Sequence, residues 1–244
     1  MRKILHLLTL AALMATPVVA GAQCVPTVAL SGDSTGTAYS MPVNTYFNYS
    51  LVEMIFDADE LGGPMTIDTI GFYFASQNVM SRATNVQIYI MYTDREEFAS
   101  STDYQVVDAT AVLVYSGALN CSHGWNNFAL STPFNYDGDG NLMVVVHDNL
   151  TGYDGASYRF ATSSTGDAYK TLERHGDILN PDPTLMAYGG TVPGTRYAYR
   201  PVMRLAGCEA AAPACHRVKN LSVTDATTNS ITIGWTDTLN TGAS

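Results

Sequence analysis

The sequence has few charged residues, and basic ones are the scarcer kind. Of its 244 residues only 14% are charged, with 12 Lys and Arg against 22 Asp and Glu, so the formal net charge is −10. A phosphate backbone is repelled by such a chain, and we therefore expect no nucleic-acid partner. The hydrophobic fraction of 46% argues against intrinsic disorder.

Long amphipathic helical stretches are also missing, whereas Tyr occurs 15 times and favours strands. Apolar residues alternate with polar ones in several runs, as in half-buried strands. In one run Ile70, Phe72 and Phe74 lie on the same face of the strand. In a second run Val86, Ile88 and Ile90 do so. Turn residues separate further runs, which give about eight strands between Cys24 and Gly207. The pattern predicts an all-β fold, an antiparallel jelly-roll-like β-sandwich over residues 23–207.

The first residues have the parts of an export signal. Cationic Arg2 and Lys3 precede an apolar run, which ends in the small-residue motif Ala20-Gly21-Ala22. We predict a signal peptide over 1–22, cleaved after Ala22, because the run is short for a membrane span of about 20 residues. Its loss takes the net charge to −12 and leaves no membrane span. Lipidation is not expected, since Gln23 precedes Cys24 where a small residue is required. The mature protein is therefore expected to be secreted or held on the outer cell surface.

Four cysteines, Cys24, Cys121, Cys208 and Cys215, enter an oxidising compartment if the chain is exported. They allow three pairings as two disulfides, and the sequence leaves all three open. The short loop between Cys208 and Cys215 favours that pair, with Cys24 and Cys121 as the other. Zinc is not expected, because Cys215 and His216 form the only adjacent pair of metal-ligand residues.

Residues 208–216, rich in small residues, predict a linker before a second unit. Beyond it, "NLSVTDATTNSITIGWTD" predicts two strands, the second with alternating Ile231, Ile233 and Trp235. This stretch resembles the start of a fibronectin type III domain, which needs about seven strands in roughly 100 residues. We therefore expect a truncated domain of that family over 217–244, and a chain that is a fragment of a longer modular protein. The alternative is that both strands pack back onto the sandwich.

The large domain resembles a β-sandwich module of secreted, multi-module surface proteins of Bacteroidetes-type bacteria. The likeness rests on stretches such as "MPVNTYFNYSLVEMIFDADELGG", "TIDTIGFYF" and "STPFNYDGDGNLMVVVHDN", and it covers most of Met41 to Leu205. The resemblance implies neighbouring peptidase, glycan-binding or adhesive units. Its motifs are structural and carry over no catalytic residue.

A calcium site is one interpretation of "NYDGDGNLMVVVHDN". Asp137, Asp139 and Asn141 offer oxygen ligands at alternate positions, and Asp148 follows further along the chain. The alternative is a plain Asp-Gly hairpin turn, because Leu142 stands where a helical calcium loop needs glycine. Calcium is the only cofactor that the sequence suggests.

Tyrosines crowd the second half of the large domain, and exposed aromatic rings can stack on sugars. The glycan-binding candidates are Tyr153, Tyr158, Tyr188, Tyr197 and Tyr199. Their alternative is an ordinary place in half-buried sheets.

The histidines of the large domain, His123, His147 and His175, come with no G-x-S-x-G elbow. We expect no enzyme in this chain. The prediction is a non-catalytic module that binds extracellular protein or glycan. The alternative is an accessory or spacer module of a secreted peptidase or glycoside hydrolase, with its catalytic domain elsewhere.

Overall fold

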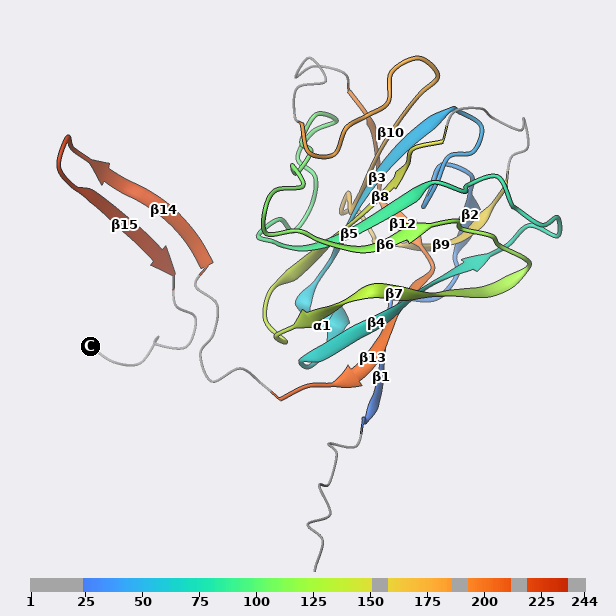
Figure 1. The fold of residues 1–244 in the computed structure, drawn as a ribbon, viewed down its shortest axis with the longest axis horizontal. Coiled ribbons are helices and arrows are strands. Elements are labelled where there is room, and N and C mark those ends of the chain that lie inside the picture. Colours follow the sequence, from blue (N-terminus) through green and yellow to red (C-terminus); the bar gives the residue numbers. More distant parts are fainter. Residues whose placement is uncertain (1–23, 151–157, 186–192, 212–218, 237–244) are drawn as a thin grey trace, which may run out of the picture.

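The computed structural model describes residues 24–150, 158–185, 193–211 and 219–236. Two antiparallel sheets pack face to face, which confirms the predicted sandwich (Figure 1). Sheet A contains β1 (Pro26–Leu30), β2 (Gly36–Ala38), β4 (Met65–Phe74), β7 (Gly124–Tyr136), β9 (Phe160–Ser164), β12 (Tyr199–Pro201) and β13 (Met203–Glu209). Sheet B contains β3 (Tyr49–Phe56), β5 (Val86–Thr93), β6 (Val112–Gly117), β8 (Asn141–Asp148), β10 (Thr171–Gly176) and β11 (Thr195–Tyr197).

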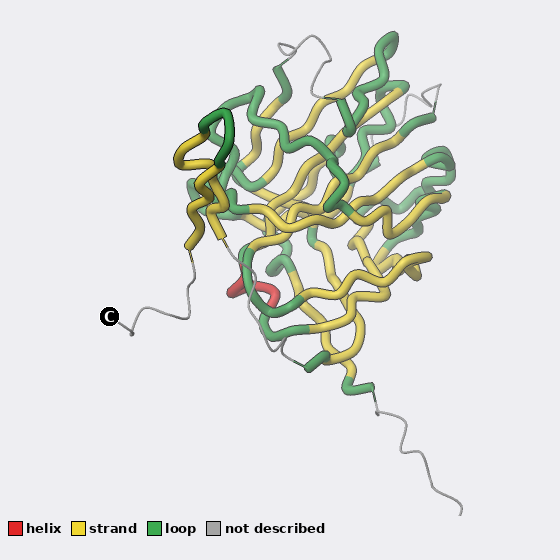
Figure 2. The backbone as a smooth tube through the Cα atoms, turned by 60° about the vertical axis from the view of Figure 1, so that its left-hand side comes forward, coloured by secondary structure: helices red, strands yellow, loops and turns green. Residues whose placement is uncertain are grey.

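The chain passes repeatedly from one sheet to the other. Strands β2 to β5 alternate between the sheets, and so do β6 to β10, as strands do in a jelly roll. In the centre of sheet A, β4 pairs with both β13 and β7. In the centre of sheet B, the strand order is β10-β3-β8-β5. Loops and strands make up nearly all of the described chain, and its one helix is the short α1 (Ala58–Leu61) (Figure 2). No helix among these residues is long and apolar enough to cross a membrane.

The main core lies between the sheets, where the predicted alternation holds. Ile70, Phe72 and Phe74 on β4 face Ile88 and Ile90 on β5, and all five side chains are fully buried. The sheets therefore stack through the residues that the period-2 pattern selects.

A second, smaller core covers the outer face of sheet B. Met143 and Val145 of β8 pack there with Phe98 and Val107 from the 94–111 loop. Because both faces of β8 are buried, the strand reads as the continuous apolar run "LMVVV".

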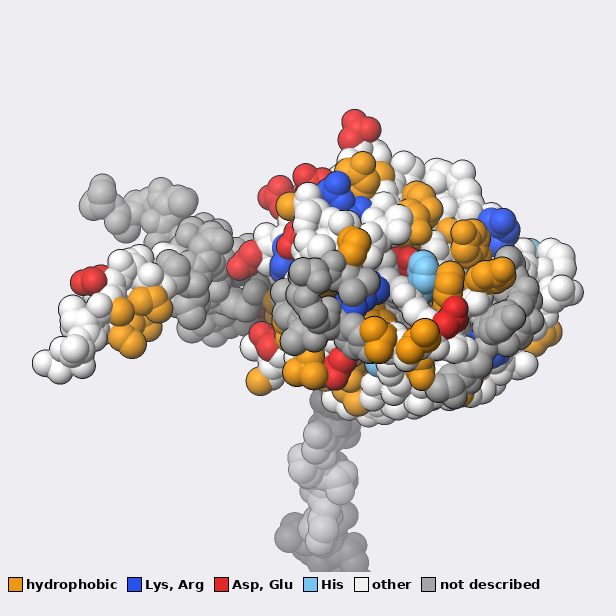
Figure 3. Space-filling view, turned by 90° about the horizontal axis from the view of Figure 1, so that it is seen from above, with side chains coloured by type: hydrophobic (Ala, Val, Ile, Leu, Met, Phe, Trp, Pro, Cys, Tyr) orange, Lys and Arg blue, Asp and Glu red, His pale blue; other side chains and the backbone are white. Residues whose placement is uncertain are grey.

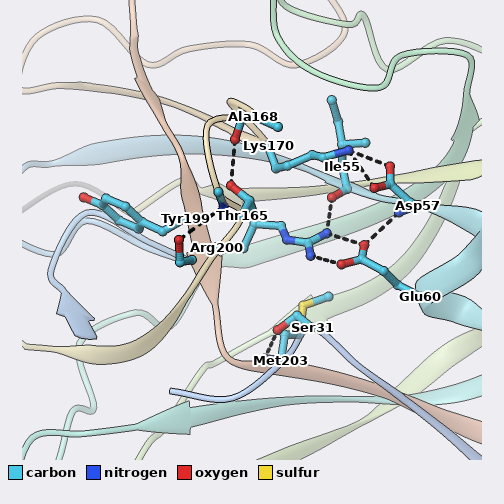
Figure 4. A network of polar contacts seen from close by, with 12 residues as sticks. Ser31, Ile55, Asp57, Glu60, Thr165, Ala168, Lys170, Tyr199, Arg200 and Met203 are labelled. Carbon is cyan, nitrogen blue, oxygen red and sulfur yellow. Dashed lines mark hydrogen bonds and ion pairs between the residues drawn. The ribbon is translucent and has the colours of Figure 1, made fainter. Parts of the chain in front are cut away.

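A buried cation ties α1 to both sheets (Figure 4). Arg200 on β12 is 2% exposed, and both of its terminal nitrogens donate to the carboxylate of Glu60. It also donates to the Ile55 carbonyl and lies 4.6 Å above the Phe56 ring. Beside it, Lys170 binds both carboxylate oxygens of Asp57 at 2.7 Å.

The disulfide differs from the pairing that spacing favours. Cys24 bonds to Cys208, which lies on β13 at the register position opposite Pro26. Cys121 is a free, buried thiol, and Cys215 lies outside the described residues. The favoured pairs, Cys208 with Cys215 and Cys24 with Cys121, are therefore both wrong, because β1 lies beside β13, a neighbour far away in sequence.

The predicted linker begins later than position 208, since β13 continues to Glu209. The two C-terminal strands form as predicted: β14 (Lys219–Ala226) and β15 (Ile231–Thr236) make a two-stranded sheet of their own. Trp235 on β15 is 59% exposed. The predicted leader, 1–22, lies outside the described residues.

Candidate functional site

The outer face of sheet B changes character toward one end. In the row formed by β3, β8 and β5, Val145 lies between Glu53 and Tyr89. Two residues further along β8, on the same face, His147 lies between Leu51 and Gln87. The second core thus gives way to polar and aromatic groups where β8 ends.

These groups line an open hollow of about 530 Å³, which the 177–185 loop bounds on one side. Its lining consists of Gln87, Tyr89, His147, Asn149, Asn180, Asp182, Pro183, Thr184 and Leu185. Neither Lys nor Arg belongs to this set. Figure 3 looks down on the top of Figure 1 and shows hydrophobic side chains mixed with polar ones on that face. The hollow combines amides, an imidazole, a carboxylate and apolar surface.

His147 is the most buried polar group of the hollow, with 4% exposure. Its Nε2 lies 2.8 Å from the Asn180 Oδ1, and Asn180 Nδ2 donates to Asn149 Oδ1. Asn149 therefore orients the Asn180 amide so that its oxygen faces the ring, which places the proton on Nε2. Nδ1 is then an acceptor, and it is buried without a hydrogen-bond partner in the described structure.

Burial lowers the pKa of His147, and this effect outweighs the hydrogen bond with Asn180 and the charge of Asp182. The ring is therefore neutral at pH 7. The neutral ring keeps an unused acceptor at Nδ1, which the surrounding atoms cover in this structure.

Asp182 brings a negative charge to the rim. Its Oδ1 accepts from the hydroxyl and the backbone N–H of Thr184, at 2.7 and 2.8 Å. These hydrogen bonds lower the pKa of Asp182. The Pro183 carbonyl accepts from Val107 N–H at 2.8 Å, which anchors the loop to the covering segment of the second core.

Tyr89 supplies a half-buried ring, and Leu185, at 59% exposure, supplies an aliphatic surface. Burial, and then the charge of Asp182, raise the pKa of Tyr89, so its phenol stays protonated. Together the two side chains offer an apolar contact beside the polar groups.

The four calcium candidates do not form one site. Asn141 and Asp148 lie at opposite ends of β8, roughly 23 Å apart at the usual rise per residue. No group of three or more His, Cys, Asp or Glu side chains in the described ranges could hold a metal ion. Asp148 therefore cannot share one ion with Asn141, and calcium binding by Asp137, Asp139 and Asn141 stays a prediction.

The side chains of Asp137, Asn141 and Asp148 have other roles. Asp137 Oδ1 accepts from Asp139 N–H at 2.9 Å, and Asn141 bridges Ala58 N–H and the Arg95 carbonyl. The turn is not a hairpin either, because β7 belongs to sheet A and β8 to sheet B.

Asp148 pairs with Arg82 at 3.1 Å. Burial raises the pKa of Asp148 to about 6, although the charge of Arg82 opposes this effect.

Three of the candidate tyrosines are half-buried against the main core, and Tyr153 and Tyr188 lie outside the described residues. Tyr158 packs 6.0 Å from Phe74, and Tyr197 and Tyr199 lie 5.0 Å apart. Burial raises the pKa of Tyr199 to about 12. These three rings join strands and core, and none of them lines the hollow.

The three histidines of the described residues hydrogen-bond to amide or carboxylate groups. His123 hydrogen-bonds to Gln77, and His175 Nδ1 lies 2.8 Å from Glu173 and stacks on Phe47. Among the hydrogen bonds of the described residues, neither ring has a Ser, Thr or Cys side chain as partner, and the same is true of His147.

Sequence reasoning missed most of the hollow. Because side chains alternate along β8 and β5, His147, Gln87 and Tyr89 lie on one outer face. The sequence could therefore have predicted this part of the hollow. No sequence pattern indicated that Asn180 and Asp182, from a loop, close the other side.

No protein-family model matches the chain, and no curated protein matches it. It is similar to the structure of the clostridial cysteine protease Cwp84 after propeptide cleavage, at 12% identity and a TM-score of 0.40, over 76% of this chain and 40% of that one. A second structure contains the cysteine protease and lectin-like domains of Cwp84, a surface layer associated protein of Clostridium difficile. That match has 12% identity and a TM-score of 0.37, over 67% of this chain and 33% of the other.

The chain therefore spans less than half of either structure. Likeness at this level carries no argument about function.

Proposed function

We propose that this chain is a non-catalytic binding module of an exported protein, and that the hollow on sheet B is its ligand site. The leader-like first residues and the Cys24–Cys208 disulfide support export, because disulfides persist in oxidising compartments.

The ligand that fits is a neutral glycan. A sugar ring presents hydroxyls that donate and accept, and an apolar face that packs on aromatic rings. The observation that carries the proposal is the joint lining of the hollow by His147, Asn180, Asp182 and Tyr89. Its only charge is negative, so sialylated or sulfated glycans are disfavoured.

We also propose that the β14–β15 hairpin belongs to a fibronectin type III-like unit, and the sandwich to the surface modules that it resembles. The exposed, alternating Ile231, Ile233 and Trp235 support the first assignment, because these positions face the core in such sandwiches.

The test is an array of neutral and acidic glycans probed with the purified chain, followed by calorimetric titration of the best neutral oligosaccharide. Asn180→Ala is expected to weaken binding at least tenfold, because His147 loses the partner that orients it. Asn135→Ala, which changes an amide on sheet A, is the matched control and is expected to bind as the wild type does. If no neutral glycan binds, or if Asn180→Ala binds equally well, the proposed site is wrong.

A further inference from the structure

The outer face of sheet A carries a row of opposed residues that spans four strands. Leu30 on β1 lies opposite Arg204 on β13, Arg204 opposite Gly71 on β4, and Gly71 opposite Asn127 on β7. Their sequence neighbours Met203, Ile70 and Phe72 are buried in the main core, so this row faces away from sheet B. Figure 1 shows these four strands as the lower layer of the sandwich.

Gly71 leaves a gap in the row, and the Arg204 side chain lies across it. A Cβ at position 71 would meet Arg204 Cγ at 2.9 Å and Asn127 Oδ1 at 2.5 Å. The backbone of Gly71 is ordinary strand, so conformational freedom is not the reason for glycine here. The missing side chain allows Arg204 to reach from β13 over β4 to β7.

On β7, two groups hold the guanidinium in place. Arg204 Nε donates to Asn127 Oδ1 at 2.7 Å, and the guanidinium lies 4.5 Å above the Trp125 ring. No salt bridge or further hydrogen bond of Arg204 occurs within the described ranges. The terminal nitrogens are therefore a fixed pair of donors on the outer face of sheet A.

Apolar and aromatic groups surround this pair of donors. Trp125 is 37% exposed and meets Tyr73 edge to face at 5.6 Å. On the other side, Leu30 and Val28 of the edge strand β1 are 52% and 53% exposed. Trp, Tyr and Arg are the residue types enriched among binding hot spots.

We infer that this face, formed by Arg204, Trp125, Tyr73, Asn127, Leu30 and Val28, docks an acidic peptide segment of a partner protein. A carboxylate of the segment pairs with the Arg204 guanidinium, and flanking apolar side chains pack on Trp125 and Leu30. Charge complementarity selects the acid, and the aliphatic rim selects a peptide over a sugar. The inference is independent of the hollow on sheet B.

A random dodecapeptide display library, selected on the immobilised wild-type chain and depleted on Arg204→Gln, tests it. We expect the selected peptides to contain Asp or Glu beside apolar residues. Calorimetric titration of a selected peptide is expected to show at least tenfold weaker binding to Arg204→Gln. Arg196→Gln is the matched control, since Arg196 also lies over an aromatic ring, Tyr169 at 4.1 Å, but on β11 of sheet B.

A twin peptide with each acid replaced by its amide is expected to bind at least tenfold more weakly than its parent. The inference is overturned if no selected peptide depends on Arg204, or if the twin binds as well as the parent. It is also overturned if polygalacturonate oligosaccharides bind this face in an Arg204-dependent manner and no peptide does, because the partner is then an acidic glycan. Unchanged thermal unfolding of Arg204→Gln serves as the folding control.

Discussion

Arg200 on β12 donates from both terminal nitrogens to the carboxylate of Glu60 on α1, and the two side chains differ in exposure. The Arg200 side chain is 2% exposed and that of Glu60 is 32% exposed. Burial alone would raise the pKa of Glu60, but the hydrogen bonds and charge of Arg200, together with the Asp57 N–H and the charge of Lys170, outweigh it and lower that pKa. Water can therefore replace Arg200 at Glu60 more easily than it can replace Glu60 at Arg200.

This asymmetry predicts which half of the pair is harder to remove. Glu60→Gln leaves a buried guanidinium without its counter-charge, and we expect a loss of about 3 kcal/mol in unfolding free energy. Arg200→Met leaves a carboxylate that water can reach, and is expected to cost less. Urea unfolding of both variants measures the difference. Equal losses, or a larger loss for Arg200→Met, contradict this account.

Glu53 makes stability depend on pH. It is 1% exposed on the outer face of sheet B, and burial raises its pKa to about 8, against a smaller opposing effect from the Gln105 N–H that it binds at 3.0 Å. In the unfolded chain the Glu53 carboxyl loses its proton near pH 4.5, its ordinary pKa. Between these two values the folded state binds more protons than the unfolded state, so stability is full below 4.5 and falls as pH rises to about 8.

Glu53→Gln removes this contribution and keeps an acceptor for Gln105. The variant is expected to lack a decline of about 1.4 kcal/mol per pH unit that the wild type shows between pH 5 and 7. Urea unfolding at half-unit steps of pH measures both slopes. Identical slopes for the two proteins would show that Glu53 is ionised in the folded state.

The sandwich was predictable because its signal is local. Alternation along β4 and β5 names the inward residues directly, since successive side chains in a strand point to opposite faces. The sheet to which each strand belongs is not a local property. The turn at Asp137 therefore looks like a hairpin in the sequence, although it connects two sheets.

The candidate site was less predictable, because its residues come together through non-local strand pairing and a loop. His147 and Tyr89 share a face by parity, but their neighbourhood depends on the β5–β8 register and on a loop that supplies Asn180. The disulfide is a further case: Cys24 and Cys208 are 184 residues apart, and only the pairing of β1 with β13 brings them together.

The Cys121 thiol is expected to be unreactive toward alkylating reagents in the folded protein. Its side chain is 1% exposed, and burial raises the pKa of the thiol to about 12. Because the thiolate is the reactive form, iodoacetamide at pH 8 should not modify Cys121 until the sandwich unfolds. A Cys215→Ser background leaves Cys121 as the only free thiol. Mass spectrometry with and without urea gives the readout, and rapid modification without urea would contradict the burial.

Reduction of Cys24–Cys208 is expected to destabilise the sandwich without abolishing it. The bond closes a loop of 184 residues, so its loss should cost about 2–5 kcal/mol through the entropy of the unfolded chain. The β1–β13 pairing spans five register positions and remains when the bond is cut, so strands are expected to persist. Cys24→Ser with Cys208→Ser, compared with the oxidised wild type in urea, measures the loss. Val223→Ser, on the separate β14–β15 sheet, is the control that should leave this transition unchanged, and an unfolded double variant would show that β1 depends on the bond.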